Sequence, residues 1–474
     1  MSPRECLKYT TSRRIILELL EKFSICADNS EMPSLELSMI VKNGASTLGR
    51  CLESVRSVVD EIVIVDTGST DASVSIGRQF GARVVEVPWA DDFSKARNAA
   101  LREGHCDWVL FLDADEMLDK ESAKTIAPLL TQSDVMGYDV RIWNYVLALT
   151  DRVLSRPATL NPHLLSAARM FPGYVEHVNV RLFLRHCDIV FEGRVHEGVA
   201  DRMKRLGLRV LPAQFVVHHL GIAEEKAEER SRKMEYYRQL GRRKLSDSPN
   251  DARAYYELGL GELEHFHDPR AALPYFIRAI ELKPHSSVLW TCLGCCLVRL
   301  GRFCEAVEAL GVAEKCGARD VSYLEALGDA QYHLEKFGEA EKNYEAAKVA
   351  GSRSSVLECK LGVCEVRLGN ARTGLGRICE AIGRAPAFGE LYDIGIAAAL
   401  FAQDERLAAE IAERRLGIGV PSAESFLLTA GIHAKLGKWQ RSAEIIQAGS
   451  ERFPGDASLH SALAEVNEKL RAVS

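Results

Sequence analysis

Three acidic residues, Asp113, Asp115 and Glu116, stand close together directly after the apolar run at residues 108–112. In an extended chain, residues two apart project to the same side, so we expect the carboxylates of Asp113 and Asp115 to leave the strand together. Carboxylates this close repel one another unless a cation neutralises them, and a hard divalent ion with oxygen ligands fits best. The cluster therefore predicts a metal site. An acidic surface turn is the alternative for an isolated Asp-x-Asp.

Strands and helices alternate in the stretch that leads to this cluster. The predicted strands cover residues 35–41, 61–65, 83–87 and 107–112. The predicted helices cover residues 46–59, 70–80 and 94–103. Such βαβ units form a parallel sheet, and its strand ends are where an α/β sheet binds ligands. No G-x-G-x-x-G follows any of these strands, and the glycines at 44 and 49 lack the Lys and hydroxyl of a phosphate loop, so both nucleotide-binding loops are excluded.

Several pieces of this stretch resemble a family 2 glycosyltransferase with the GT-A nucleotide-sugar-binding fold. They are Met39-Ile-Val-Lys-Asn43, Val65-Asp-Thr-Gly-Ser-Thr-Asp71, Pro88-Trp89 with Asp92-Phe-Ser-Lys-Ala-Arg-Asn98, and Leu112-Asp-Ala-Asp-Glu116. The likeness is almost continuous over residues 35–119, and weaker pieces run on to about residue 221. It is closest to the bacterial subgroup that includes lipopolysaccharide-core and peptide S-glycosyltransferases. The resemblance implies an inverting, metal-dependent enzyme that moves a sugar from a nucleotide sugar, with a UDP-hexose as the expected donor.

On the nucleotide side, the resemblance places Asp66 on the uracil N3–H and Asn43 in the same pocket. It makes Arg97, near the start of a predicted helix, a contact of the nucleotide or diphosphate, which suits the preference of helix N-termini for anions. The residues themselves leave alternatives open. Asp66 could instead cap the Asp-Thr-Gly-Ser turn, and Arg97 could form an ion pair with Asp91 or Asp92.

On the metal side, the resemblance assigns Asp113 to the ribose and a metal-bound water, and Asp115 to direct ligation of Mg²⁺ or Mn²⁺. Glu116 is expected to be structural. His219, in a His-x-Gly pattern, resembles the late metal-side histidine of the family, although Gly221-Ile222 stands where the family has Gly-Tyr. A satisfied core histidine is the alternative for His219.

On the acceptor side, Phe191-Glu-Gly-Arg-Val-His-Glu197 matches the Val-His-Glu segment of the family. We therefore expect Glu197 to be the general base that takes the proton from the acceptor. His196 is an alternative base. An ion pair of Glu197 with Arg194 or Arg181 would be a purely structural role.

Composition limits the function classes. The 474 residues require two or three domains, and 47% hydrophobic with 27% charged residues indicates a globular protein. A net charge of -6 excludes the basic surface of a nucleic-acid-binding protein, and the Arg/Lys clusters at 202–209 and 238–244 are expected to be solvated helix faces. The 13 cysteines are scattered without metal-site spacing, which suits a reducing cytoplasm. No segment reaches the roughly 18 apolar residues of a membrane span, so we expect a cytoplasmic protein with no transmembrane segment.

The chain divides into four predicted parts. Residues 1–33 form an N-terminal extension with a short amphipathic helix, residues 34–222 the transferase domain, and residues 223–249 a helical linker. The acceptor half of the transferase contains strand-like segments at 138–146, 181–184, 188–193 and 215–219, and a proline-containing loop at 150–173 near the active site.

Residues 250–474 contain an internal repeat. A glycine recurs at intervals of 33–36 residues, at Gly259, Gly294, Gly328, Gly362, Gly395 and Gly431. With the alanines at 306 and 340 and trailing prolines, this spacing resembles six tetratricopeptide repeats, followed by a capping helix at 460–473. The glycines are expected where the two helices of a repeat approach closely. The predicted fold is thus an α/β GT-A domain with a Rossmann-like mixed, mainly parallel sheet, followed by an all-α solenoid.

The solenoid offers a concave surface for an extended peptide or a partner protein, so a polypeptide acceptor is one expectation. A lipopolysaccharide or lipid-linked glycan acceptor is another. A catalytically inactive transferase acting as a repeat-based adaptor is a third possibility, which the intact acidic motif disfavours. A nucleotidyltransferase would need a glycine-rich loop after the first strand, and the segment Leu37-Ser-Met-Ile-Val-Lys-Asn-Gly-Ala-Ser46 does not supply one.

Overall fold

The computed structural model describes residues 32–473 apart from 133, 148–151, 154–155, 163 and 225–226. The predicted N-terminal extension therefore lies outside the described residues except for its last two. The chain divides into two compact units, which meet in sequence between Pro284 and His285. No helix in the described part of the chain is long and apolar enough to cross a membrane.

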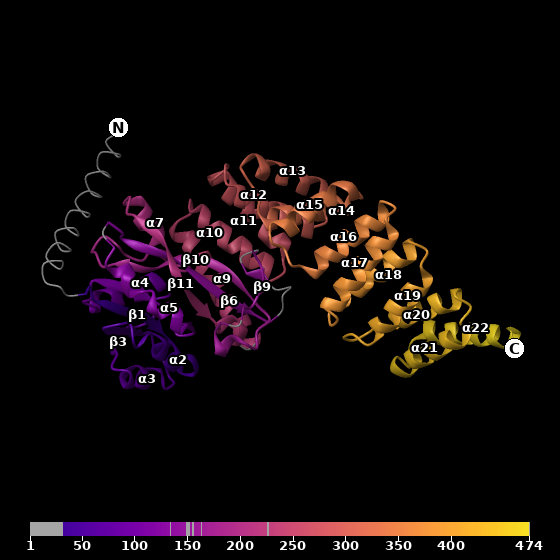
Figure 1. The fold of residues 1–474 in the computed structure, drawn as a ribbon, viewed down its shortest axis with the longest axis horizontal. Helices are drawn as coiled ribbons and strands as arrows, with labels where there is room; N and C mark the ends of the chain where they lie inside the picture. Colours follow the sequence, from indigo (N-terminus) through magenta and orange to yellow (C-terminus); the bar gives the residue numbers. More distant parts are fainter. Residues whose placement is uncertain are drawn as a thin grey trace. The chain divides into compact units, whose positions relative to one another are not determined.

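A mixed β-sheet forms the core of the first unit (Figure 1). Its strands are β1 (Leu35–Val41), β2 (Glu61–Asp66), β3 (Arg83–Glu86), β4 (Trp108–Phe111), β5 (Glu116–Leu118), β6 (Gly137–Val146), β9 (Thr159–Leu160), β10 (Gly173–Leu184) and β11 (Val210–His219). The order across the sheet is β3-β2-β1-β4-β10-β6-β11-β5, and β9 pairs with β10. Strands β1 to β4 are parallel to one another, whereas β10 runs antiparallel to both β4 and β6. The predicted α/β fold with a mixed sheet is confirmed.

Helices cover both faces of the parallel half of the sheet. The helices of this half are α2 (Ala45–Val55), α3 (Ser73–Gln79) and α4 (Phe93–Glu103). One face of the sheet packs on α2 through residues such as Leu52, and the other packs on α4 through Ala96 and Ala100. The small side chains of α4 let this helix lie close to the strands, which brings its polar residues to the sheet edge.

Two local predictions in the acceptor half are wrong. Residues 188–193 form no strand beyond an isolated bridge between Glu192 and Gly198, because the buried Ile189 and Phe191 belong to a loop that packs into the core. Residues 150–173, predicted as a loop, include described short elements: β7 (Arg152–Val153) paired with β8 (Arg156–Pro157), β9, and a 3₁₀ turn at Ser166–Ala168.

Several further helices complete the first unit. They are α5 (Lys120–Lys124), α6 (Ala127–Leu130), α7 (Ala200–Arg205), α8 (Gly221–Glu224), α9 (Ala227–Asp247), α10 (Ala252–Leu260), a π-helical turn at Gly261–His265, and α11 (Pro269–Leu282). The first predicted repeat, α10 with α11, thus belongs to the same compact unit as the sheet. The expectation that residues 238–244 form only a solvated face is wrong for Lys244, which is 9% exposed.

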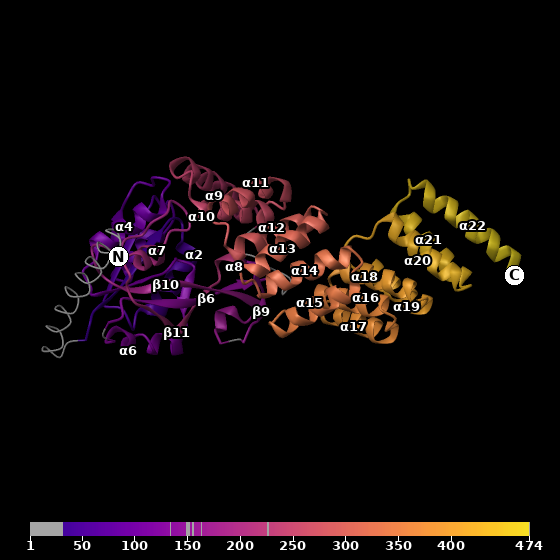
Figure 2. The same ribbon diagram turned by 90° about the horizontal axis from the view of Figure 1, so that it is seen from above.

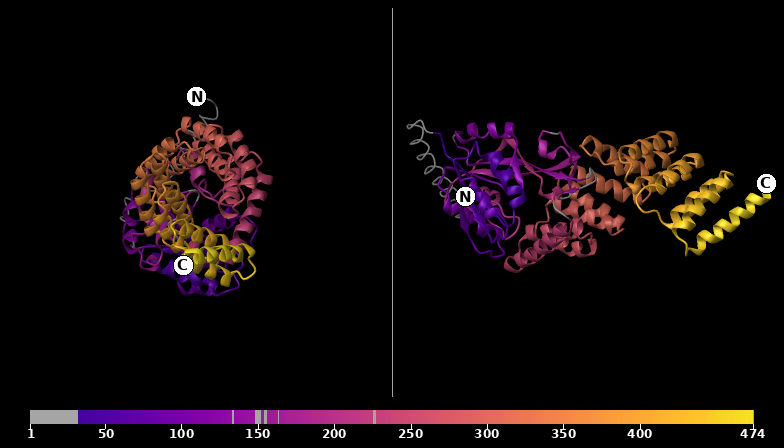
Figure 3. Two further views of the ribbon diagram at one scale, coloured as in Figure 1. Left: turned by 90° about the vertical axis from the view of Figure 1, so that its right-hand side faces the viewer. Right: turned by 90° about the horizontal axis from the view of Figure 1, so that it is seen from below.

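The second unit is a stack of helix pairs in chain order (Figures 2 and 3). The pairs are α12 (Ser287–Arg299) with α13 (Phe303–Lys315), α14 (Val321–His333) with α15 (Phe337–Val349), α16 (Ser355–Arg367) with α17 (Ala371–Arg384), α18 (Gly389–Phe401) with α19 (Glu405–Leu416), and α20 (Ala423–Lys435) with α21 (Trp439–Arg452). The last helix, α22 (Ala457–Val473), follows as the predicted cap. With α10 and α11, six pairs match the six predicted repeats.

Five of the repeat glycines have close neighbours, four of them on the second helix of the same pair and Gly395 most closely on α17 of the preceding pair. A Cβ at Gly294 would lie 2.5 Å from Leu310, and one at Gly328 would lie 2.6 Å from Tyr344, both on the second helix of the same pair. Gly431 is the exception, because it is exposed and a Cβ added to it would meet no other atom within 4 Å. The residue that faces the core there is the neighbouring Ala430, which is 1% exposed.

Candidate active site

The acidic cluster lies in a turn between β4 and β5 rather than on an extended strand. The N–H of Glu116 donates to the carbonyl of Asp113 at 3.0 Å and closes this turn. Asp113 and Asp115 therefore have different partners. Asp113 lies 2.5 Å from Arg97 and 3.7 Å from Arg181, whereas Asp115 lies 3.3 Å from His219. Part of the positive charge that the sequence predicts beside the two aspartates thus comes from Arg97, Arg181 and His219.

Glu116 is the buried anchor of the turn. Its Oε1 accepts a 2.5 Å hydrogen bond from Arg181, and its Oε2 accepts the N–H of Asp113 at 2.8 Å. Burial raises the pKa of Glu116 to about 7, although Arg181 acts to lower it. From the sequence, Arg181 was considered only as a partner of Glu197. Its place at the start of the strand-like segment 181–184, shortly before the segment of Glu197, could have marked it as a residue of this site.

Arg97 connects the acidic turn to the predicted base. It is 4% exposed, and its Nη2 donates to Asp113 at 2.5 Å while its Nε donates to Glu197 at 2.6 Å. Burial alone would raise the pKa of Asp113, but Arg97 and Arg181 hold it well below its usual range. The Nη1 atom of Arg97 is buried and has no hydrogen-bond partner among the described residues.

The alternative prediction, an ion pair of Arg97 with Asp91 or Asp92, is wrong. Asp92 instead caps α4, where its side chain accepts the N–H of Lys95 at 3.2 Å. Asp91 forms an ion pair with Arg243 and accepts a hydrogen bond from Tyr236. The reason is geometric: Arg97 lies on the face of α4 that is turned to the sheet, whereas Asp91 and Asp92 precede the helix.

Glu197 follows a turn at the rim of the sheet domain, and the structural partners expected for it are absent among the described contacts. Arg194 pairs with Asp247 and Arg181 pairs with Glu116, so Arg97 is the arginine that holds Glu197. His196, the alternative base, is exposed.

Tyr237 on α9 is a neighbour of this site that sequence reasoning missed. Its ring contacts Phe93 and His196 with centroid distances of 5.8 and 6.4 Å. Burial raises the pKa of Tyr237 to about 12, and the nearby carboxylates, including Asp113 and Glu197, add to this, so the phenol stays protonated. The aromatic pair at 236–237 within an otherwise charged helix was the available signal.

His219 lies at the end of β11 and faces Asp115. Its Nδ1 lies 2.8 Å from Asn144 Oδ1, and Asn144 lies 2.7 Å from His177 Nδ1, so the ring is held by a short polar chain. Burial by itself would lower the pKa of His219, but Asp115 and then Glu116 and Asp113 raise it to about 9. Gly221 is required beside this pair, because a Cβ there would lie 1.8 Å from Asp115 Oδ2.

His218 has a different environment from His219. It is completely buried, with Nδ1 2.9 Å from the Tyr145 hydroxyl and Nε2 3.0 Å from Asp119. Burial lowers the pKa of His218, and Asp119 only partly compensates. This is a satisfied core histidine.

The residues fit a divalent cation at Asp115 and His219. A carboxylate oxygen and an imidazole nitrogen face each other at 3.3 Å, and both side chains retain solvent access, at 25% and 20% exposure. These are donor types that Mn²⁺ and related ions accept. Asp113 does not join them: within the described residues it belongs to no group of three ligand atoms closer than 4.8 Å to one another.

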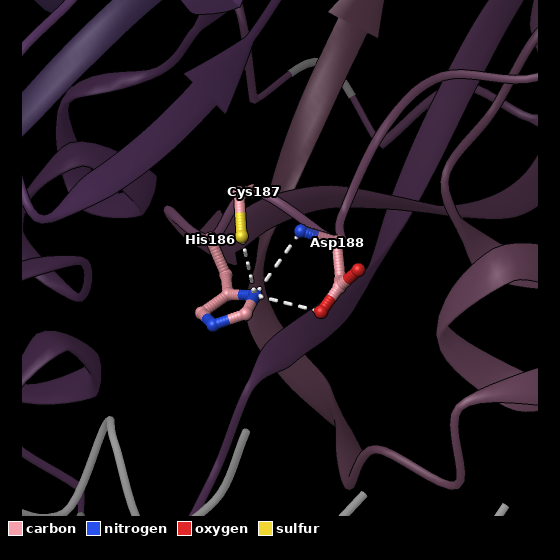
Figure 4. A group of neighbouring side chains, drawn as sticks. All are labelled: His186, Cys187 and Asp188. Atoms are coloured by element: carbon pink, nitrogen blue, oxygen red, sulfur yellow. Dashed lines mark hydrogen bonds and ion pairs between the residues drawn. The ribbon is translucent and has the colours of Figure 1, made fainter. Parts of the chain in front are cut away.

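His186, Cys187 and Asp188 do form such a group (Figure 4). Their contacts indicate that they stabilise a turn of the chain. The Nδ1 of His186, which faces the other two side chains, already accepts the N–H of Asp188 at 3.1 Å. Arg202 donates to the carbonyl of Asp188 at 2.9 Å and lies 3.8 Å from its carboxylate. These contacts hold the turn that follows β10.

Asp66 ends β2, and Asn43 follows the end of β1. The two strands are parallel neighbours with Val41 paired to Asp66, so both residues lie at the same edge of the sheet. Asp66 is 3% exposed, and its Oδ2 accepts the N–H groups of Gly68 and Ser69 at 3.0 and 2.9 Å. The predicted turn-capping role is thus taken by one oxygen. The other, Oδ1, is buried without a hydrogen-bond partner among the described residues.

Asn43 holds the loop that follows Asp66. Its backbone adopts a left-handed conformation with φ 54°, and its Oδ1 accepts the N–H of Thr70 at 2.8 Å. Its own N–H donates to Ser69 Oγ at 2.9 Å. Asn43 therefore holds the loop that lies beside Asp66.

Residues 37–180 match the family model described as Glycosyl transferase family 2. A TPR repeat-containing protein of Synechococcus elongatus is 32% identical over 236 residues, which cover 48% of this chain and 52% of that protein. An uncharacterized glycosyltransferase of Rickettsia felis is 34% identical over 116 residues, covering 23% of this chain and 40% of that protein. The chain thus spans about half or less of the length of these curated relatives.

Among solved structures, a tetratricopeptide repeat protein from Parabacteroides merdae is similar with a TM-score of 0.38 and 13% identity, covering 50% of this chain and 96% of that one. The family match covers Asp66, Arg97, Asp113 and Asp115 and ends before Glu197 and His219. Residues 37–180, which carry the first part of this site, therefore match a family 2 glycosyltransferase domain, and the same chain continues into a stack of helix pairs.

Proposed function

We propose that the protein is an inverting, metal-dependent glycosyltransferase that moves a hexose from a UDP-sugar to an acceptor. The observation that carries this proposal is the position of Arg97 between Asp113 and Glu197, at 2.5 and 2.6 Å. This contact joins the residue assigned to the donor and the residue assigned to the acceptor in one site. A single displacement needs both within reach of the same sugar carbon.

The nucleotide pocket supports a uracil base. Among the described residues, the buried Oδ1 of Asp66 has no hydrogen-bond donor, and an imide N–H such as uracil N3–H would satisfy it. Asn43 keeps the surrounding loop in place through Thr70. The partnerless Nη1 of Arg97 would serve as a donor to the ribose or the diphosphate.

Asp115 and His219 would hold Mg²⁺ or Mn²⁺. When bound, such an ion supplies positive charge that stabilises the departing diphosphate. Asp113, which Arg97 holds, would contact the ribose and a water of the ion. Asn144 would keep the imidazole of His219 oriented through its 2.8 Å hydrogen bond.

Glu197 is proposed to be the general base. Arg97 holds its Oε1, which leaves Oε2 to take a proton. As the acceptor atom attacks the anomeric carbon, its proton passes to Glu197, and the bond from that carbon to the diphosphate oxygen breaks. Attack from the face opposite the leaving group inverts the anomeric configuration, and UDP leaves as the second product.

We further propose a polypeptide acceptor held by the repeats, because stacked helix pairs present an extended surface suited to peptides. A glycan acceptor would place no requirement on the solenoid.

The testing experiment measures UDP release from a panel of UDP-sugars with Mn²⁺ or Mg²⁺, comparing the wild type with Asp115→Asn. We expect metal-dependent release from one donor, lost in the variant. The absence of both release and UDP binding in the wild type would contradict the proposal and favour an inactive, adaptor-type domain. UDP binding without release would support the donor site. The acceptor would then be sought by using the repeat domain to capture it.

A further inference from the structure

The turn that carries Glu197 has an unfavourable backbone conformation. Gly193 has φ 104°, and His196, directly before Glu197, has φ 52°. A left-handed backbone costs a residue with a Cβ free energy, and it persists where surrounding contacts enforce it. The contacts that enforce this turn therefore determine where the carboxylate of Glu197 points.

Three successive carbonyl groups of the turn accept hydrogen bonds from three different helices. The N–H of Phe93, at the start of α4, donates to the carbonyl of Arg194 at 2.9 Å. Lys244 Nζ, from α9, lies 3.4 Å from the carbonyl of Val195. Arg253 Nη2, from α10, lies 3.3 Å from the carbonyl of His196. Two of the three donors thus come from helices beyond the predicted transferase domain.

The two cations are themselves fixed by the first repeat. Glu257 on α10 lies 2.8 Å from Lys244 Nζ with one oxygen and accepts from Arg253 Nε at 2.7 Å with the other. Arg253 also pairs with Asp201 at 2.8 Å. Lys244 is buried, so its ammonium depends on Glu257 for compensation of its charge.

A further link joins the turn to the end of α9. The side chain of Arg194 pairs with Asp247 at 2.5 Å and donates to the carbonyl of Asp91 at 3.0 Å. Asp91 in turn pairs with Arg243 of α9. The turn is therefore clamped from both its backbone and its side chain by the segment that follows the sheet domain.

We infer that Lys244 and Arg253, held by Glu257, are positioning residues of the transfer reaction, and that the first repeat is part of the machinery that aims Glu197. This inference rests on the proposed role of Glu197 as base. It assigns α9 and α10 a positioning role in the reaction in addition to linking the transferase to the solenoid. None of the three residues needs to touch the substrate.

The test uses the full-length protein with the variants Lys244→Met and Arg253→Gln. Matched controls are Arg242→Gln on α9, a 51% exposed residue, and Arg278→Gln on α11, which pairs with Glu281 at 2.6 Å. For each protein, kcat, the KM for the UDP-sugar and the affinity for UDP with Mn²⁺ are measured. We expect kcat to fall about ten- to hundredfold in the two test variants, because the base is displaced, while KM and UDP affinity change less than about twofold.

Two additional variants separate positioning from general damage. Arg253→Lys keeps a cation that can reach the carbonyl of His196, and we expect it to recover most of the lost kcat. In a Glu197→Gln background, Lys244→Met should cause almost no further loss, since there is no base left to position.

The inference is overturned if the test variants keep wild-type kcat, if UDP affinity falls in parallel with kcat, or if Lys244→Met and Glu197→Gln are fully additive. Failure of the proposed function itself has a different signature, because then the wild type neither binds UDP nor releases it. The controls are expected to match the wild type in every measurement.

Discussion

Arg97 and Glu197 lie 100 residues apart in the chain, and a 2.6 Å hydrogen bond joins Arg97 Nε to Glu197 Oε1. The same guanidinium binds Asp113, so one buried cation holds a carboxylate from each half of the site. Its planar group can bond two carboxylates at once, which a lysine cannot do with the same geometry. The donor and acceptor sides of the proposed reaction therefore share one structural element.

Replacing the base should separate chemistry from binding. In Glu197→Gln, which keeps the shape of the side chain, we expect kcat to fall about 10²- to 10⁴-fold, because the acceptor proton loses its destination. UDP affinity should stay within about twofold, since Glu197 lies on the acceptor side. His196→Gln is the matched control, and steady-state kinetics with calorimetry measures both. A larger loss in His196→Gln than in Glu197→Gln would transfer the role of base to His196.

Gly221 should be intolerant of any side chain. A Cβ at this position would lie 1.8 Å from Asp115 Oδ2, so Gly221→Ala must displace the carboxylate from His219. We expect Mn²⁺-dependent activity to fall at least about tenfold, as for a disturbed ligand shell. Gly49→Ala is the control, since its Cβ would meet only a methyl group of Ile76 at 4.0 Å. Titration of activity against Mn²⁺ concentration measures the change. Equal metal dependence in both variants would contradict the assigned ligand.

The metal-free protein should lose stability as pH rises through the alkaline side of neutrality. The pKa of His219 is about 9 in the folded protein against an ordinary value of 6.5, because Asp115 stabilises the protonated ring against the effect of burial. A raised pKa contributes stability that is complete below about pH 6.5 and is lost as the pH rises through 9. We expect a loss of about 1–3 kcal/mol over this window.

Thermal unfolding of the metal-free protein between pH 6.5 and 8.5 measures this effect. His219→Gln should be less dependent on pH across the same window, because it lacks the titrating ring. An identical pH dependence in wild type and variant would show that the ion pair with Asp115 does not contribute.

The repeat glycines allow a matched pair of substitutions in the solenoid. A Cβ at Gly328 would lie 2.6 Å from the fully buried Tyr344, so Gly328→Ala should destabilise this unit by about 1–3 kcal/mol through overpacking. Gly431 lies exposed within α20 with open space around it, and Gly431→Ala should instead stabilise the helix by about 0.5–1 kcal/mol. Urea unfolding followed by circular dichroism measures both. Destabilisation by Gly431→Ala would contradict the assignment of Ala430 as the core-facing residue.

Much of the fold could be predicted because its signals are local. The predicted strand at Leu35–Val41 is mostly apolar, with only Glu36 and Ser38 polar, and the structure places β1 at these bounds. The repeat period follows from glycines that must be small, and four of the six pack closely against the second helix of their own pair as expected. Gly431 was misassigned because its neighbour Ala430 is also small, and only the three-dimensional contact distinguishes the two.

The site was less predictable because its contacts are long-range. Asp113 and Asp115 were expected to act together, but the turn after β4 directs them to different partners, Arg97 and His219. The pairing of Arg97 with Glu197 depends on how the loop before Glu197 packs against α4, which no local pattern encodes. Ile189 and Phe191 similarly produced a strand-like pattern because a buried loop needs apolar residues too.

The most direct test of the account is calorimetric binding of UDP to the full-length protein with and without Mn²⁺, comparing wild type with Asp115→Asn and Asp66→Asn. We expect the wild type to bind UDP tightly only with the metal, Asp115→Asn to lose this dependence, and Asp66→Asn to bind at least about tenfold more weakly because the base-binding oxygen is lost. Equal UDP affinity in all three proteins, with or without Mn²⁺, would contradict the assignment of this site to a metal-bound nucleotide sugar.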